Sequence, residues 1–81
     1  MARNFTDVVK AIKEIAPQEL VDALDKSMCF WAPEAIWHKL SEYVNRYVVA
    51  DSTDETSVAV YAILCDCSKD EMRARFKADN L

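Results

Sequence analysis

The sequence predicts an all-α fold, in which residues 1–81 form one domain, a compact bundle of five short helices with the fourth helix central. The chain contains no glycine, whereas hairpin-rich β folds need residues with positive φ in their tight turns. Apolar residues recur at helical spacing in several segments. The segment from Val58 to Cys65 carries no charged or amide side chain, so a helix there has to be buried on every side.

The first helix is expected over residues 5–15 and the second over residues 17–28. Asn4 or Thr6 can cap the first helix, whose apolar residues have amphipathic spacing at Val8, Val9, Ile12 and Ile15. Pro17 separates the two helices, because proline suits a first helical turn and restricts the residue before it. The second helix should turn Leu20, Val21, Leu24 and Met28 inward and leave Asp22 and Asp25 in water.

The third helix is expected over residues 33–49 and has the most continuous apolar stripe in the chain. The stripe follows 3.6-residue spacing and comprises Ile36, Trp37, Leu40, Tyr43, Val44, Tyr47 and Val48. Trp37 is therefore expected in the core, whereas His38 and Glu42 fall on the opposite, solvent-facing side.

The fourth helix is expected over residues 53–66 and the fifth over residues 68–78. Ser52 followed by Glu55 fits a capping box at the start of the fourth, and Ser68 followed by Glu71 fits one at the start of the fifth. The β-branched residues between Val58 and Ile63 would also suit a strand, and periodicity alone does not decide for so short a run. A helix is favoured because no partner strand with two-residue alternation is evident.

Composition excludes several classes of function. The formal net charge of −4 disfavours nonspecific binding to nucleic acid or anionic membranes, which depends on lysine and arginine. The absence of glycine removes any phosphate-binding loop, and no apolar run reaches transmembrane length. Residues 1–4 lack the apolar run of a signal peptide. An odd count of three cysteines favours reduced thiols, so we expect a cytoplasmic protein.

Neither a metal site nor catalysis is expected. The candidate zinc ligands are Cys65 and Cys67 with Cys29 and His38, but two cysteines two residues apart on a helix point about 200° apart. Cys29 and Cys65 are therefore interpreted as small buried apolar residues. His38 has no evident acid or nucleophile partner and lies on the solvent face of its helix. No cofactor is expected.

Residues 51–53, Asp-Ser-Thr, match two of three positions of the Asp-Ser-Leu that begins the second helix of acyl carrier proteins. Those proteins are also acidic, helical and small, and the resemblance would imply phosphopantetheine on Ser52. The usual glycine before the aspartate is absent, and Ser52 lies too far along the chain. Helix capping accounts for Ser52 without further assumption.

The connector after the second helix is unusual because it reads Cys29-Phe30-Trp31, whereas connectors are normally polar. These side chains either close the end of the core or form an exposed patch, and both alternatives stay open for Trp31. Exposed aromatic residues with charged neighbours are typical of protein-binding surfaces. The candidate partner-binding residues are Phe30, Trp31, Asp51, Asp54 and Glu55.

The sequence thus favours a non-enzymatic protein-binding module that occupies the surface of another protein. Both an adaptor and an inhibitor, including a phage-type inhibitor of host machinery, remain open. The second class is a structural homodimer, in which part of the fourth helix forms the dimer core. The third is a helix-turn-helix nucleic-acid binder, which the acidic and aromatic character of the expected recognition helix disfavours.

Overall fold

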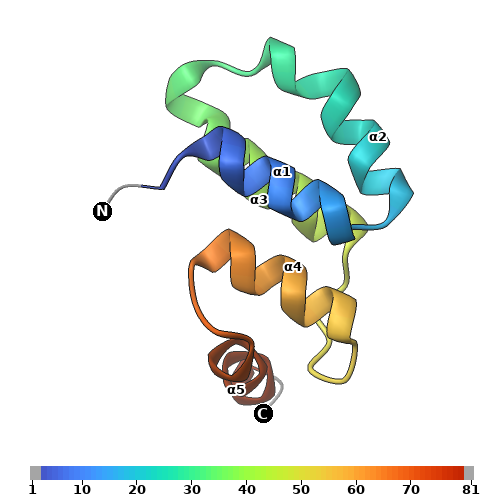
Figure 1. Ribbon diagram of the computed structural model, residues 1–81, viewed down its shortest axis with the longest axis vertical. Helices are drawn as coiled ribbons and strands as arrows, with labels where there is room; N and C mark the ends of the chain where they lie inside the picture. The colour runs from blue at the N-terminus through green and yellow to red at the C-terminus, as the bar shows by residue number, and fades with distance from the viewer. Residues whose placement is uncertain (1–2, 80–81) are drawn as a thin grey trace.

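A computed structural model describes residues 3–79, and it confirms the predicted all-α bundle (Figure 1). The helices of this part of the chain are α1 (Phe5–Ile15), α2 (Gln18–Ser27), α3 (Ile36–Tyr47), α4 (Glu55–Cys65) and α5 (Lys69–Asp79). Two 3-10 turns, Met28–Phe30 and Pro33–Ala35, connect α2 to α3. Within residues 3–79 there is no strand, and no helix there is long and apolar enough to cross a membrane.

Helix α4 is the central element, as predicted. It contacts α1, α3 and α5, while α2 packs against α3. Figure 1 shows α4 running across the view between the α1–α3 pair and α5, which is seen end-on. Because neighbours lie on opposite sides of α4, most of the side chains on its middle section are buried.

The burial of α4 follows from this arrangement. Six of its residues are buried, namely Ser57, Val58, Val60, Tyr61, Ala62 and Leu64, and Val58 and Val60 are fully inaccessible. These positions point in several directions around a helix of 3.6 residues per turn. Only Ala59 and Ile63 on the middle of the helix are half-buried. The alternative interpretation of this segment as a strand is wrong.

The start of α4 differs from the predicted capping box. The cap is Asp54, whose carboxylate accepts hydrogen bonds from the backbone N–H groups of Thr56 (2.9 Å) and Ser57 (3.3 Å). The prediction that Ser52 caps the helix is wrong, because Ser52 lies in a separate turn that the Asp51 carboxylate closes by accepting from the Thr53 N–H (2.9 Å). The helix therefore begins at Glu55.

The predicted cap of α5 is confirmed, since the Glu71 N–H donates to Ser68 Oγ (3.1 Å).

The predicted helix over residues 33–49 is shorter in the structure. Pro33 opens a 3-10 turn, α3 begins at Ile36, and no side chain caps this start. At the other end Val48 is extended (φ −125°, ψ 115°), which turns its side chain into the core at 6% exposure.

The end of α4 is a Schellman motif with an aspartate in the left-handed conformation. Asp66 has φ 57° and ψ 50°, and the Cys67 N–H donates back to the Ala62 carbonyl (3.1 Å). Left-handed positions favour glycine because a Cβ atom crowds the neighbouring carbonyl. The Arg3 guanidinium donates to the carbonyls of Ile63 (2.6 Å) and Leu64 (2.8 Å) in this turn. These two hydrogen bonds connect the segment before α1 to the end of α4.

Replacing Asp66 with glycine is expected to raise the free energy of unfolding by about 1 kcal/mol. The substitution removes the Cβ atom from a left-handed residue and a carboxylate from the negative end of the α4 dipole. Urea denaturation measures the change, and Asp66→Asn, which removes the charge alone, separates the two contributions. An Asp66→Gly variant no more stable than the original chain would contradict the assigned conformation.

Candidate protein-binding site

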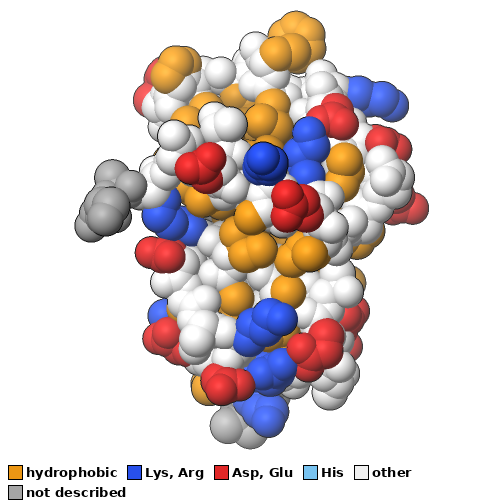
Figure 2. Space-filling view, viewed as in Figure 1, with side chains coloured by type: hydrophobic (Ala, Val, Ile, Leu, Met, Phe, Trp, Pro, Cys, Tyr) orange, Lys and Arg blue, Asp and Glu red, His pale blue; other side chains and the backbone are white. Residues whose placement is uncertain are grey.

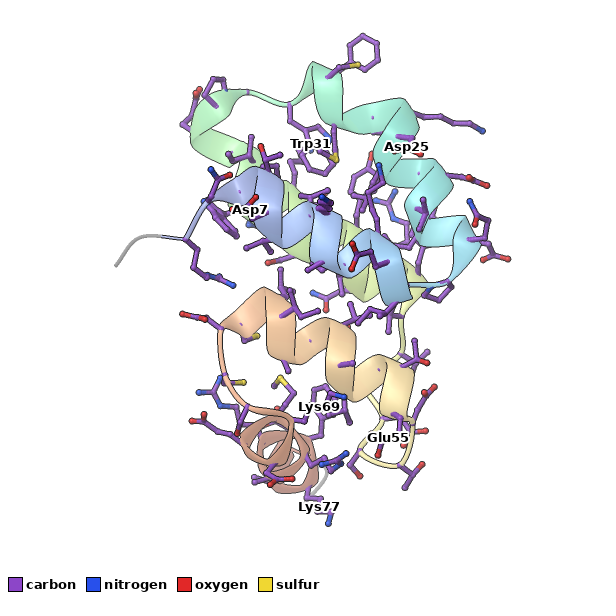
Figure 3. All side chains as sticks on the ribbon, in the orientation of Figure 1. Asp7, Asp25, Trp31, Glu55, Lys69 and Lys77 are labelled. Atoms are coloured by element: carbon purple, nitrogen blue, oxygen red, sulfur yellow. The ribbon has the colours of Figure 1, made fainter. Side chains whose placement is uncertain are left out.

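The structure separates the five predicted site residues into two groups. Phe30 and Trp31 lie in the connection between α2 and α3, whereas Asp51, Asp54 and Glu55 lie before and at the start of α4. Figure 3 shows Trp31 near one end of the long axis and Glu55 near the other. The predicted combination of aromatic and acidic residues therefore does not form one surface.

Phe30 projects from the connector and is 83% exposed. Its neighbour Trp31 is half-buried, and its ring packs against Tyr43 of α3 with centroids 5.1 Å apart. The Trp31 N–H donates to the Met28 carbonyl (3.2 Å) and closes the 3-10 turn. Because the turn is tight and Trp31 occupies its inner side, Phe30 is left in solvent. Trp31 therefore lies at the edge of the core, and it is neither fully buried nor part of an exposed patch.

The three carboxylates at the other end of the molecule all have partners within the chain. The Thr53 N–H, and then its hydroxyl at 2.7 Å, hold the pKa of the Asp51 carboxyl below its ordinary value. Asp54 caps α4, and both Glu55 oxygens accept from Arg73 of α5 at 2.7 Å. These contacts hold the loop before α4 and connect α4 to α5, so the three residues have structural roles that require no partner.

Other exposed carboxylates lie on α2 and on the connector that carries Phe30. Asp22, Asp25 and Cys29 are exposed, and their spacing of three and four residues places them on one outward stripe that leads to the connector. Glu34 is exposed in the second 3-10 turn. Figure 2 shows acidic and basic side chains interspersed on the α2 side of the molecule below the projecting hydrophobic side chains. We refer to Asp22, Asp25, Phe30 and Glu34 as the Phe30 edge.

An apolar groove lies between α1 and α2 next to this edge. It has a volume of about 550 Å³ and is lined by the apolar residues Val9, Val21 and Met28 and by the polar residues Thr6, Lys10, Lys13 and Glu14. A second hollow of about 350 Å³ continues it, sharing Met28 and Lys13 and reaching Cys29. The Lys13 ammonium forms an ion pair with Asp25 across the two helices. The groove thus ends at the turn that carries Phe30.

The expectation that Trp37 lies in the core is wrong. Its exposed fraction is 37%, its ring packs edge-on against Phe5 (5.1 Å), and the Arg3 guanidinium lies 4.9 Å from the ring centroid. The apolar stripe of α3 is wider than the surface that the neighbouring helices cover, and within α3 only Leu40 and Val44 are buried. Trp37 consequently lies at the margin of the core.

The interpretation of Cys29 and Cys65 as buried residues is also wrong, because both are exposed and all three cysteines are free thiols. Cys29 lies in the exposed 3-10 turn, and Cys65 is the last residue of α4. His38 is on the solvent face as expected, with its side chain 80% exposed and 3.6 Å from Glu42. Within residues 3–79, no three His, Cys, Asp or Glu side chains are grouped so that they could hold a metal ion.

Comparisons with protein-family models, with curated proteins and with solved structures give no significant match. The function therefore has to be argued from the geometry of the Phe30 edge and its neighbouring groove.

Proposed function

We propose that the protein is a non-enzymatic protein-binding module anchored by Phe30. The observation that supports this is a phenylalanine 83% exposed at the end of an apolar groove. Transferring a phenylalanine side chain from water into a partner is worth about 1.5–3 kcal/mol. Aromatic anchors of this kind contribute most of the binding energy at protein interfaces.

The connector supports the anchor because it holds Phe30 in place before binding. Trp31 packs on Tyr43, and its N–H closes the turn, so the backbone on either side of Phe30 is fixed by the core. A side chain presented from a fixed backbone loses less conformational entropy on binding than one on a free loop. An adaptor and an inhibitor would both use such an anchor to occupy a partner's surface.

The alternative of a homodimer formed through α4 has less support. The apolar residues of α4 pack against α1, α3 and α5 within the chain. On its middle section only Ala59 and Ile63 retain partial exposure. Two half-buried side chains of α4 supply only part of the about 800 Å² per partner in a standard interface.

Replacing Phe30 with alanine is expected to abolish capture of the partner. The test is affinity capture from an extract of the source cells with the original chain, with Phe30→Ala and with Val49→Ala. Val49 is a matched control because it is 81% exposed and follows α3, away from the connector. For the captured partner we expect an increase in Kd of about 30-fold or more with Phe30→Ala and no change with Val49→Ala. Equal binding by all three chains, or no captured protein at all, would refute the proposal.

A further inference from the structure

We propose that Cys65, Cys67 and Met72 form a binding site for a soft monovalent metal ion, Cu⁺, at the junction of α4 and α5. The first observation is the position of two sulfur atoms. The Cys67 Sγ lies 3.8 Å from the Met72 Sδ, and Met72 is 5% exposed, whereas Cys67 is half-buried. Two sulfurs that are each about 2.3 Å from one ion lie about 3.8–4.0 Å apart when the angle between them is tetrahedral or trigonal. The pair therefore already has the spacing of two ligands of one ion.

The turn at the end of α4 brings the third sulfur ligand to the same place. Asp66 is left-handed, so Cys67 is not on the helix, and the Cys67 N–H donates back to the Ala62 carbonyl (3.1 Å). Cys65 follows Ala62 by three residues and is therefore its neighbour on the helix surface. Both cysteines thus lie beside Ala62, and the separation of about 200° expected for two cysteines on one helix does not apply. Figure 3 shows sulfur atoms, in yellow, where the chain passes from α4 to α5.

The site is accessible from solvent and largely preformed. Cys65 is exposed, and Cys67 lines an open hollow of about 690 Å³ between α1 and α4. Met72 belongs to the hydrophobic core, which holds its thioether in place, and the backbone of Cys67 is held by its hydrogen bond. Binding an ion therefore has to order only the side chain of Cys65, so little conformational entropy is lost.

The types of ligand select the ion. Soft thiolate and thioether ligands together suit Cu⁺, whereas the ligands of Zn²⁺ are thiolate, imidazole and carboxylate. Across residues 3–79 no three His, Cys, Asp or Glu side chains are grouped around one point, so harder metals lack a complete donor set there. Binding forms bonds from copper to the thiolates of Cys65 and Cys67 and to the thioether of Met72, and it releases the two thiol protons to solvent. Copper stays in the +1 state, so no electron is transferred.

The test is titration of the reduced protein with Cu⁺ in the absence of oxygen, with ascorbate to keep the ion reduced and a chromogenic chelator as competitor. We expect the original chain to bind a single ion, and Cys65→Ser and Cys67→Ser each to lose at least tenfold in affinity. Their matched control is Cys29→Ser, which removes the exposed thiol of the connector and should lose none.

Met72→Leu tests the thioether, because leucine keeps an apolar side chain of similar size in the core. Loss of a residue that only orients a metal ligand already costs about 10–100-fold in affinity, so we expect at least a tenfold loss from Met72→Leu. Its matched control Met28→Leu should bind Cu⁺ as tightly as the original chain. X-ray absorption of the copper-loaded original chain should find three sulfur ligands around the ion.

Three results would overturn the inference. If Met72→Leu binds Cu⁺ as tightly as Met28→Leu, thiols alone hold the ion and the sulfur contact is only packing. If Cys29→Ser loses as much affinity as Cys65→Ser, copper binds to any exposed thiol of the chain. A shell of two sulfurs by X-ray absorption contradicts the site even where a variant does not fold. None of these results depends on Phe30, so the proposed function is tested separately.

Discussion

Replacing Val60 with aspartate is expected to abolish cooperative folding of the chain. Val60 is fully inaccessible and lies on α4, which other helices cover on opposite sides. An unpaired carboxylate in such a site costs several kcal/mol, whether it stays charged or takes up a proton. Domains of this size have stabilities near the low end of about 5–15 kcal/mol. Circular dichroism during heating should show no cooperative transition for Val60→Asp.

The matched control is Val49→Asp, which introduces the same side chain at a position 81% exposed. Its free energy of unfolding should differ from that of the original chain by no more than about 0.5 kcal/mol. If Val60→Asp unfolds with the same midpoint as Val49→Asp, α4 is not buried as described.

Replacing Ser57 with alanine is expected to lower the free energy of unfolding by about 2 kcal/mol. Ser57 is 1% exposed, and its hydroxyl donates to the Val49 carbonyl (2.6 Å) and accepts from the Asp51 N–H (3.1 Å). Alanine leaves both backbone groups without this partner and releases the loop between α3 and α4. Urea denaturation monitored by tryptophan fluorescence measures the change.

Ser52→Ala is the control for this prediction, because Ser52 lies in the same loop and α4 is capped by Asp54 instead. We expect Ser52→Ala to change the free energy of unfolding by less than about 0.5 kcal/mol. A larger effect from Ser52→Ala than from Ser57→Ala would restore the predicted capping box and contradict the structure at this loop.

Much of the fold could be predicted because each helix carries its own pattern. The bounds of α1 match the expected residues 5–15, and the absence of polar residues between Val58 and Cys65 was sufficient to identify α4 as the central helix. The helix α4 ends one residue earlier than expected. It ends there because Asp66 adopts a left-handed conformation, which glycine and asparagine adopt more often than aspartate at the end of a helix.

The candidate site was harder to predict because it depends on how loops bring distant residues together. Sequence correctly indicated that an aromatic connector was unusual, but it did not show which ring turns inward. The Trp31 ring turns inward because it packs against Tyr43, which lies twelve residues further along the chain. The sequence groups Asp51, Asp54 and Glu55 with Phe30 because exposed aromatic residues with charged neighbours are typical of binding surfaces. The carboxylates on the α2 side are instead found from the helical spacing of Asp22, Asp25 and Cys29.

Amide hydrogen exchange followed by NMR tests the central position of α4 most directly. The account predicts that the N–H groups of residues 58–64 exchange among the slowest in the protein, with protection close to the global free energy of unfolding. The amides of α5, which contacts the bundle mainly through α4, should exchange faster. Rapid exchange across residues 58–64, with slow exchange confined to α1, α2 and α3, would contradict a fold built around α4.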